Sequence, residues 1–177
     1  MVWVLGRSVD YLLGALRFAR GAAPSSPTPC AGWDLRTLLG HLDDSLDALA
    51  EAAGRGRVAL EAEPGSGSSV DGLRERARAL PPAWSGVSEV TIGGVPVEPD
   101  VVLAAGSIEL AVHGWDVATA CGVRGAMPDD LALALWQVAP TLVTKADRPW
   151  RFAEPVPVSA GSGTGDRLLA FLGRVPL

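Results

Sequence analysis

One of the chain's two histidines lies at helical spacing from two acidic residues. Glu109 precedes His113 by four residues, and Asp116 follows it by three. In an α-helix these spacings place all three side chains on one face. A carboxylate and an imidazole one turn apart can chelate a divalent ion, with His41 as a third ligand from another helix. Two histidines and one carboxylate leave open coordination positions, which are typical of catalytic rather than structural zinc sites.

The same residues also fit a role without a metal. Glutamate and histidine four residues apart occur on exposed helices as a mildly stabilising pair. His41 lies about 100–120° from the leucine face of its helix, where a half-buried or exposed histidine would be ordinary. The residues on its side are small and would leave room for a cavity or a neighbouring helix: Thr37, Ser45, Ala48 and Ala52. The spacing alone therefore leaves both interpretations open.

Asp116 and Tyr11 are the candidates for a catalytic role. Asp116 could orient a ligand histidine, or it could hydrogen-bond the end of its own helix. Tyr11, the one tyrosine, could donate a proton to a substrate, although a lone tyrosine is also common at the edge of a core. Cys30 has no base beside it in the sequence. We therefore expect it to be a small buried residue rather than a nucleophile or fourth ligand, and we expect the same of Cys121.

Other charged residues favour surface roles. We expect the adjacent pair Asp43 and Asp44 to form a solvated face. Arg148 and Arg151 could attract an anionic substrate, but ordinary surface arginines are the simpler interpretation.

Helices are predicted to position these residues. Apolar side chains recur at helical spacing, and prolines and glycines divide the chain. We expect helices over residues 2–20, 34–53, about 70–80, 100–121, 128–145 and 165–173. Asp34 is predicted to cap the second helix, and Gly122 to end the third long one. Four main helices suggest an all-α bundle, whose facing helices can build a metal or cofactor site.

The remaining segments are predicted to be a hairpin and loops. Two short β-rich runs flank Gly93 and Gly94, which predicts a small β-hairpin over 88–97. Residues 63–69 are the most linker-like segment, and 147–163 is expected to be extended. The expected organisation is a single domain over 1–177, with residues 147–177 as a short C-terminal extension.

Composition excludes several classes of protein. The chain has 177 residues, 48% hydrophobic and 20% charged, which excludes a disordered chain. A net charge of −5 argues against a nucleic-acid partner. No apolar run reaches about 18 residues, so we expect no membrane span. Arg7, Asp10 and Arg17 interrupt the apolar start and no small-residue cleavage site follows it, so we expect no signal peptide. Two cysteines are too few for a secreted disulfide framework, and a cytoplasmic location fits them best.

Three segments resemble a known superfamily. They are PTPCAGWDLRTLLGHL (27–42), IELAVHGWDVATACG (108–122) and VPVSAGSGTGDRLLAFLGRVP (156–176). The first two resemble motifs of the DinB-like, mycothiol-dependent maleylpyruvate isomerase superfamily, and the third resembles the tail of its short actinobacterial metal-binding branch. The resemblance implies a DinB-like four-helix bundle with a divalent metal, zinc or nickel, on His41, Glu109 and His113. It also implies that Trp33 and Trp115 pack around the site.

The resemblance and the residues together suggest three functions. The first is a metal-dependent enzyme acting on a small-molecule substrate, either as a mycothiol-dependent isomerase or S-transferase or as a Lewis-acid tailoring enzyme of secondary metabolism. The chain has 14 arginines, one lysine and no asparagine, which favours a high-GC bacterial source, and an actinobacterium would contain mycothiol. The second function is a non-catalytic metal-binding or metal-sensing module, and the third is a homodimer scaffold. The maleylpyruvate isomerases carry a second domain that we do not expect here.

Overall fold

The computed structural model describes residues 1–59, 69–123 and 125–176, and over these residues the chain is mostly helical. The α-helices of the described residues are α1 (Val2–Ala19), α2 (Leu35–Arg55), α3 (Val70–Ala83), α4 (Pro99–Ala120), α5 (Asp129–Leu142) and α6 (Thr164–Phe171). The strands are β1 (Arg57–Val58), β2 (Val90–Ile92) and β3 (Val95–Val97), and Lys145–Asp147 forms the 3-10 turn η1. The predicted linker at 63–69 lies outside the described residues, except for Ser69.

The chain divides into two compact units, Met1–Val123 and Arg124–Leu177. The first unit contains α1 to α4 and the sheet, and the second contains α5, η1 and α6. The sequence predicted 128–145 as the fourth main helix. In the structure this segment forms α5 of the second unit, and the first unit contains the shorter helix α3 beside α1, α2 and α4. Helical spacing shows that a segment has an apolar face and does not show which helices cover it. The prediction of one domain over 1–177 stays a prediction.

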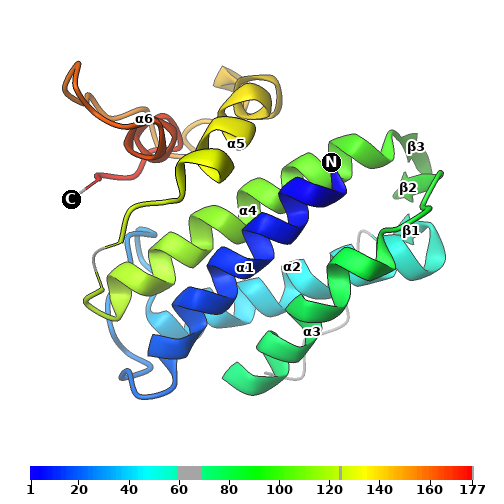
Figure 1. Ribbon diagram of the computed structural model, residues 1–177, viewed down its shortest axis with the longest axis horizontal. Helices are drawn as coiled ribbons and strands as arrows, with labels where there is room; N and C mark the ends of the chain where they lie inside the picture. The colour runs from blue at the N-terminus through cyan, green and yellow to red at the C-terminus, as the bar shows by residue number, and fades with distance from the viewer. Residues whose placement is uncertain (60–68, 124, 177) are drawn as a thin grey trace. The chain divides into compact units, whose positions relative to one another are not determined.

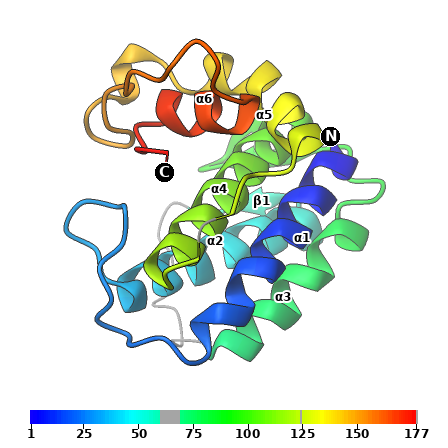
Figure 2. The ribbon, with the colours of Figure 1, turned by 60° about the vertical axis from the view of Figure 1, so that its left-hand side comes forward.

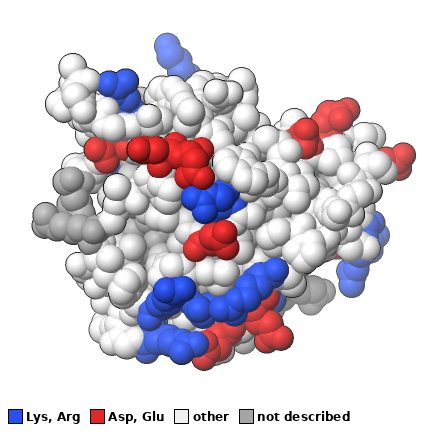
Figure 3. Space-filling view, viewed as in Figure 1, with Lys and Arg blue, Asp and Glu red and all other residues white. Residues whose placement is uncertain are grey.

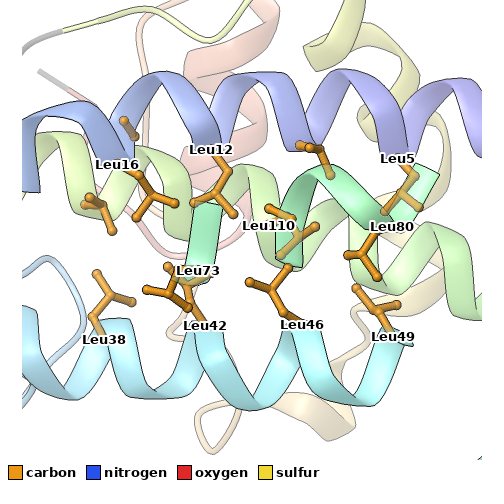
Figure 4. Close-up of a cluster of buried hydrophobic side chains, with 14 of the residues drawn as sticks. Leu5, Leu12, Leu16, Leu38, Leu42, Leu46, Leu49, Leu73, Leu80 and Leu110 are labelled. Carbon is orange, nitrogen blue, oxygen red and sulfur yellow. The ribbon is translucent and has the colours of Figure 1, made fainter. Parts of the chain in front are cut away.

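The helices of the first unit enclose a leucine-rich core. Helix α1 packs against α3 and α4, and α2 packs against the same two helices (Figures 1 and 2). Figure 4 shows leucines from all four helices pointing toward one another. The labelled residues are Leu5, Leu12 and Leu16 of α1, Leu38, Leu42, Leu46 and Leu49 of α2, Leu73 and Leu80 of α3, and Leu110 of α4. This core fixes the spacing of α2 and α4, which carry the candidate metal ligands.

Helix α2 begins and ends where the sequence predicts. The side chain of Asp34 accepts a hydrogen bond from the Thr37 backbone N–H at 2.8 Å, which satisfies one of the free donors at the helix start. Gly56 ends the helix with a φ of 63°, in the left-handed region that favours glycine. Helix α4 ends at Ala120, as predicted, and Gly122 follows with a φ of 73°.

Helix α3 extends beyond its predicted end near residue 80. It continues through Pro81 and Pro82 to Ala83. The Trp84 backbone N–H donates to the Leu80 carbonyl at 3.2 Å, so the helical turn closes beyond both prolines. Trp84 is buried in the core, and this tertiary packing outweighs the local tendency of proline to end a helix.

The predicted hairpin is present and belongs to a larger sheet. Strands β2 and β3 pair antiparallel across Gly93 and Gly94, whose φ angles are 57° and 81°. Positive φ at both positions is what a tight hairpin turn requires. Strand β1, which the sequence analysis did not predict, pairs parallel to β2 and places Val58 beside Ile92. The sheet order is therefore β1-β2-β3.

Helix α4 is the central element of the first unit. It meets the length and composition of a membrane-spanning helix, with a mean hydropathy of 1.3 over 18 residues, although the chain has no continuous apolar run of that length. Of that window, 83% is buried inside the protein, as in the core helix of a soluble protein. Its buried polar residues include His113 and Asp116, which suit a buried site rather than lipid contact.

The charged residues of the first unit form mixed networks. Figure 3 shows basic and acidic side chains lying together over α3 and the neighbouring end of α1. The prediction that Asp43 and Asp44 form a solvated face is wrong for Asp43, which is buried and paired with Arg76 of α3. Asp44 is exposed, as expected. The ion pair between α2 and α3 explains the burial, because a buried carboxylate requires a charged partner.

The second unit is organised around Phe171. The Trp136 and Phe171 rings pack edge to face at 5.7 Å, and the Arg148 guanidinium lies 5.1 Å from the Phe171 ring centre. Arg148 also donates to the Phe171 carbonyl at 2.7 Å. Arg151 pairs with Asp147 at 3.6 Å. Both arginines therefore have partners within this unit, which favours the structural interpretation over a role in anion capture.

Candidate metal centre

The three predicted ligands come together from two helices of the first unit. His41 lies on α2, and Glu109 and His113 lie one turn apart on α4. One ligand atom from each side chain lies within 4.8 Å of the other two. His113 Nε2 is 3.2 Å from Glu109 Oε1, and His41 Nε2 contacts the same oxygen. Ser45 of α2, which the sequence analysis did not propose for the site, also donates to this oxygen at 3.3 Å.

The donor set fits a divalent ion such as zinc. Zinc–nitrogen and zinc–oxygen bonds of about 2.0–2.1 Å in a tetrahedral site separate two ligand atoms by about 3.3 Å. The separation of 3.2 Å between His113 Nε2 and Glu109 Oε1 agrees with this geometry, whereas His41 Nε2 lies closer to this oxygen than two ligands of one ion would. Two imidazoles and a carboxylate suit zinc or nickel better than calcium or magnesium, which prefer oxygen ligands. The described residues add no fourth side chain to this group.

Asp116 lies on the other side of the His113 ring. The Nδ1–H of His113 donates to Asp116 Oδ2 at 2.9 Å, and Asp116 is completely buried. This hydrogen bond fixes the ring so that Nε2 faces Glu109 and His41. Carboxylates commonly hold metal-ligating histidines in this way. Of the two roles considered for Asp116, the geometry favours orientation of the ligand.

Cys30 lies closer to the site than the sequence indicated. Its thiol donates to Asp116 Oδ2 at 3.2 Å and lies 3.8 Å from His113 Nδ1. With His113 and Asp116 it forms a second group of potential metal ligands. It is half-buried and is not simply a packing residue. Cys121 packs against the core, as Cys30 also does, and burial raises the pKa of the Cys121 thiol.

A short loop before α2 holds Cys30 and Trp33 in place. Thr28 anchors this loop, because its hydroxyl donates to the Trp33 carbonyl at 2.9 Å and accepts from the Cys30 N–H at 3.1 Å. The Trp33 ring centre lies 5.0 Å from that of His41 and 6.3 Å from that of His113. Trp33 therefore packs against both candidate ligands, as the resemblance implied.

The charges of the candidate ligands depend on one another. Burial disfavours a charged Glu109, but hydrogen bonds from His113 and His41 hold the pKa of its carboxyl well below the usual range. Burial also disfavours a charged His113, but hydrogen bonds to Asp116, Cys30 and Glu109 raise its pKa to about 11. In the metal-free protein a proton on His113 therefore balances the surrounding carboxylates. A metal ion would replace that positive charge.

Tyr11 of α1 lies against α4 near Asp116. A Cβ on Gly114 would lie 3.3 Å from the Tyr11 ring. Because glycine has no Cβ, α1 and α4 pack closely at this point. Burial, and then the negative charge of Asp116, raise the pKa of Tyr11 to about 12. Tyr11 is thus a weaker acid than a free tyrosine. Its role as a proton donor stays a prediction.

A cavity of about 250 Å³ adjoins the site. Residues of α2, α4, β1 and β2 line it, and Glu109 and Ser45 supply its polar side chains. Ser45 and Ala48, two of the small residues on the His41 side of α2, are among the lining residues. The room that the sequence suggested on this side of α2 is therefore present.

Comparison with known proteins identifies relatives of this chain. A family model described as "Mycothiol maleylpyruvate isomerase N-terminal domain" matches residues 5–118, which include all the candidate site residues. Two curated proteins of Mycobacterium tuberculosis are each 26% identical to this chain. They are "Uncharacterized protein MT0763" of strain CDC 1551 / Oshkosh and "Uncharacterized protein Rv0738" of strain ATCC 25618 / H37Rv. Each match covers 95% of this chain and 94% of the relative. No solved structure matches the chain.

Proposed function

The chain belongs to the mycothiol maleylpyruvate isomerase N-terminal domain family, and from this premise we propose that it is a metal-dependent enzyme with a centre formed by His41, Glu109 and His113. The observation that carries the proposal is the convergence of these three ligand atoms, each within 4.8 Å of the others. We interpret α1 to α4 as the DinB-like bundle that supports the centre.

The protein residues have distinct roles in this centre. A divalent ion bound here supplies Lewis acidity, which lowers the pKa of a coordinated thiol or water and polarises a substrate carbonyl. Glu109 is the one carboxylate among the three ligands, so an ion of charge +2 would keep a net positive charge. Asp116 holds the proton on Nδ1 of His113 and leaves Nε2 free to bind. Trp33 packs against both imidazoles and limits their rotation.

The proposed reaction is attack by a low-molecular-weight thiol on an electrophilic small molecule. The family description supports mycothiol as that thiol. Isomerisation would follow if the thiol adds to the substrate and later leaves, and S-transfer would follow if it stays attached. The predictions of a cytoplasmic location, a homodimer and no nucleic-acid partner are part of this proposal.

The position of Asp116 favours an enzyme over a metal sensor. A closed site would need a fourth protein ligand, and Asp116 is the further carboxylate that contacts a candidate ligand. In the structure Asp116 contacts Nδ1 of His113, whereas Glu109 contacts Nε2 on the other side of the ring. Asp116 therefore lies behind a ligand rather than at the open side of the centre.

Metal content and thiol binding together test the proposal. Protein purified without chelators should contain about one equivalent of zinc or nickel. Glu109→Gln should lose the metal, while Glu51→Gln, a matched change on α2 outside the ligand group, should keep it. Protein loaded with cobalt(II) should develop a thiolate-to-cobalt absorption band when mycothiol is added. No metal uptake on titration, or full uptake by Glu109→Gln, would contradict the proposed centre.

A further inference from the structure

The cavity beside Glu109 indicates what kind of substrate the site accepts. We infer that it binds the uncharged, apolar part of the substrate, an aliphatic chain or a ring, whose polar reactive end lies at Ser45 and Glu109. This inference rests on the proposed function, because it makes the cavity part of the same site. The argument depends on the lining, the space and the size of the cavity.

Over the part of the chain that the structure describes, the polar lining of the cavity lies beside the candidate ligands. Glu109 belongs to both the ligand group and the cavity lining, and Ser45 donates to its Oε1. The other lining side chains are apolar and include Val58, Ile92 and Val102. A substrate bound here would therefore have its polar group next to the ligands and its apolar part among these side chains.

Small side chains on the two ligand-bearing helices create the space. Ala48 of α2 and Ala105 and Gly106 of α4 line the cavity. A Cβ on Gly106 would lie 2.6 Å from Leu49 Cδ2, so the Leu49 side chain of α2 packs directly against α4 at Gly106. The ligand-bearing helices are thus held together next to a space that their own side chains leave empty.

The small sheet supplies another wall of the cavity. Val58 of β1 and Ile92 of β2 are direct partners in the parallel pair, and both line the cavity. Backbone pairing of the two strands holds these residues next to each other, so this wall is more rigid than a loop. The sheet therefore has a role in this otherwise helical unit, because it forms part of the site.

Size and charge narrow the class of substrate. A volume of about 250 Å³ lies just below the usual range of about 300–1,000 Å³ for small-molecule sites. Among the described lining residues, the carboxylate of Glu109 is the one charged side chain, and none of them carries a positive charge. A second anionic group on the buried part of the substrate would therefore lack a partner.

Alkyl hydroxamates of increasing length can measure this preference. They chelate zinc through the hydroxamate and extend a chain of chosen length. From acetohydroxamate to octanohydroxamate, calorimetry on the zinc-loaded protein should show affinity rising about fourfold per buried methylene until the cavity is full. The monohydroxamate of suberic acid has the same chain length as octanohydroxamate but ends in a carboxylate. It should lose most of this gain.

Leucine variants test whether the dependence of affinity on chain length arises in the cavity. Ala48→Leu and Ala105→Leu should abolish the dependence on chain length while keeping metal content and acetohydroxamate affinity. Ala105 is exposed, so its replacement does not disturb the core if Ala48→Leu fails to fold. Ala50→Leu, on an exposed position of the same helix and outside the cavity lining, is the control and should behave as wild type.

Straight-chain alcohols test the cavity without a metal. Their binding to metal-free protein, followed by saturation-transfer NMR, should increase with chain length and be lost in Ala48→Leu and Ala105→Leu. If alcohols bind in this way but no metal binds, the proposed function fails and the cavity inference stands. If metal binds but neither series depends on chain length, or both leucine variants keep that dependence, the cavity inference is wrong and the metal centre stands.

Discussion

Replacing His113 with alanine should affect both metal binding and stability. Asp116 is completely buried, and the His113 imidazole donates to it at 2.9 Å. The pKa of about 11 means that His113 carries the compensating positive charge in the metal-free protein. His113→Ala would remove the charged donor that contacts the buried Asp116 carboxylate, while the Cys30 thiol still donates to it. A thiol is a weak donor and carries no charge.

The expected loss of stability follows from this burial. Removing one partner of a buried ion pair costs about 3–5 kcal/mol. Typical stabilities are about 5–15 kcal/mol, so the variant should remain folded with a reduced margin. With a urea dependence of about 2 kcal/mol per molar, the unfolding midpoint should fall by about 1.5–2.5 M. Adding Asp116→Asn removes the buried negative charge that His113 pairs with, so His113→Ala/Asp116→Asn should recover part of the loss.

Urea titration of the metal-free proteins, followed by circular dichroism, measures these differences. Zinc analysis of the same preparations should find a loss of bound metal in both variants, because two ligands from different helices remain. An unchanged midpoint in His113→Ala, with no recovery in the double variant, would show that Asp116 does not depend on a charged partner. A full equivalent of zinc in His113→Ala would show that the ligand set is wrong.

Four further outcomes are expected. Zinc affinity measured by calorimetry should rise about tenfold per pH unit between about pH 6 and 9, because zinc must displace the proton that a pKa of about 11 keeps on His113; a constant affinity would contradict this. Because this folded-state pKa lies above the unfolded value of about 6.5, metal-free protein in urea titrations should lose stability as the pH rises from about 6.5 toward 11. Cys30→Ser should keep its zinc, since a hydroxyl can also donate to Asp116, whereas Cys30→Val should cost about 1–3 kcal/mol in urea; equal midpoints would show that the donor is unimportant. Asp34→Ala removes the cap of α2 and should lower the melting temperature by about 2–4 °C, and an unchanged value would mean that the cap contributes little.

Much of the candidate site could be predicted from the sequence because two of its ligands are close together in the chain. Glu109 and His113 are four residues apart, so the helix period alone places them on one face. The sequence offered His41 as a third ligand from another helix, the resemblance implied the same set, and the structure brings the three residues together. Whether a metal binds there stays a prediction. Ser45 and Cys30 were missed because their contacts join residues 64 and 86 positions apart, and no local pattern reports such pairs.

The same distinction between local and distant contacts explains the fold. Helix α2 was predicted because its leucine spacing and its Asp34 cap are local signals. Strand β1 has two residues and is defined by pairing with β2, more than 30 positions away, so its own sequence does not distinguish it from a loop. Burial of Asp43 depends on Arg76 of a different helix. The helical segments were therefore easier to predict than the partners that each one contacts.

On α2 and α4, the small residues that line the cavity lie at positions separate from those of the candidate ligands, and this affects how relatives of the protein can diverge. Both helices carry a candidate metal ligand and, within two turns of it, a small residue that lines the cavity: Ala48 on α2 and Ala105 on α4. Neither alanine belongs to the fully buried core. After gene duplication, substitutions at these two positions could resize the cavity while leaving the ligands and the leucine core untouched. Descendants of one ancestor could thus acquire new substrates through few mutations while keeping a common chemistry.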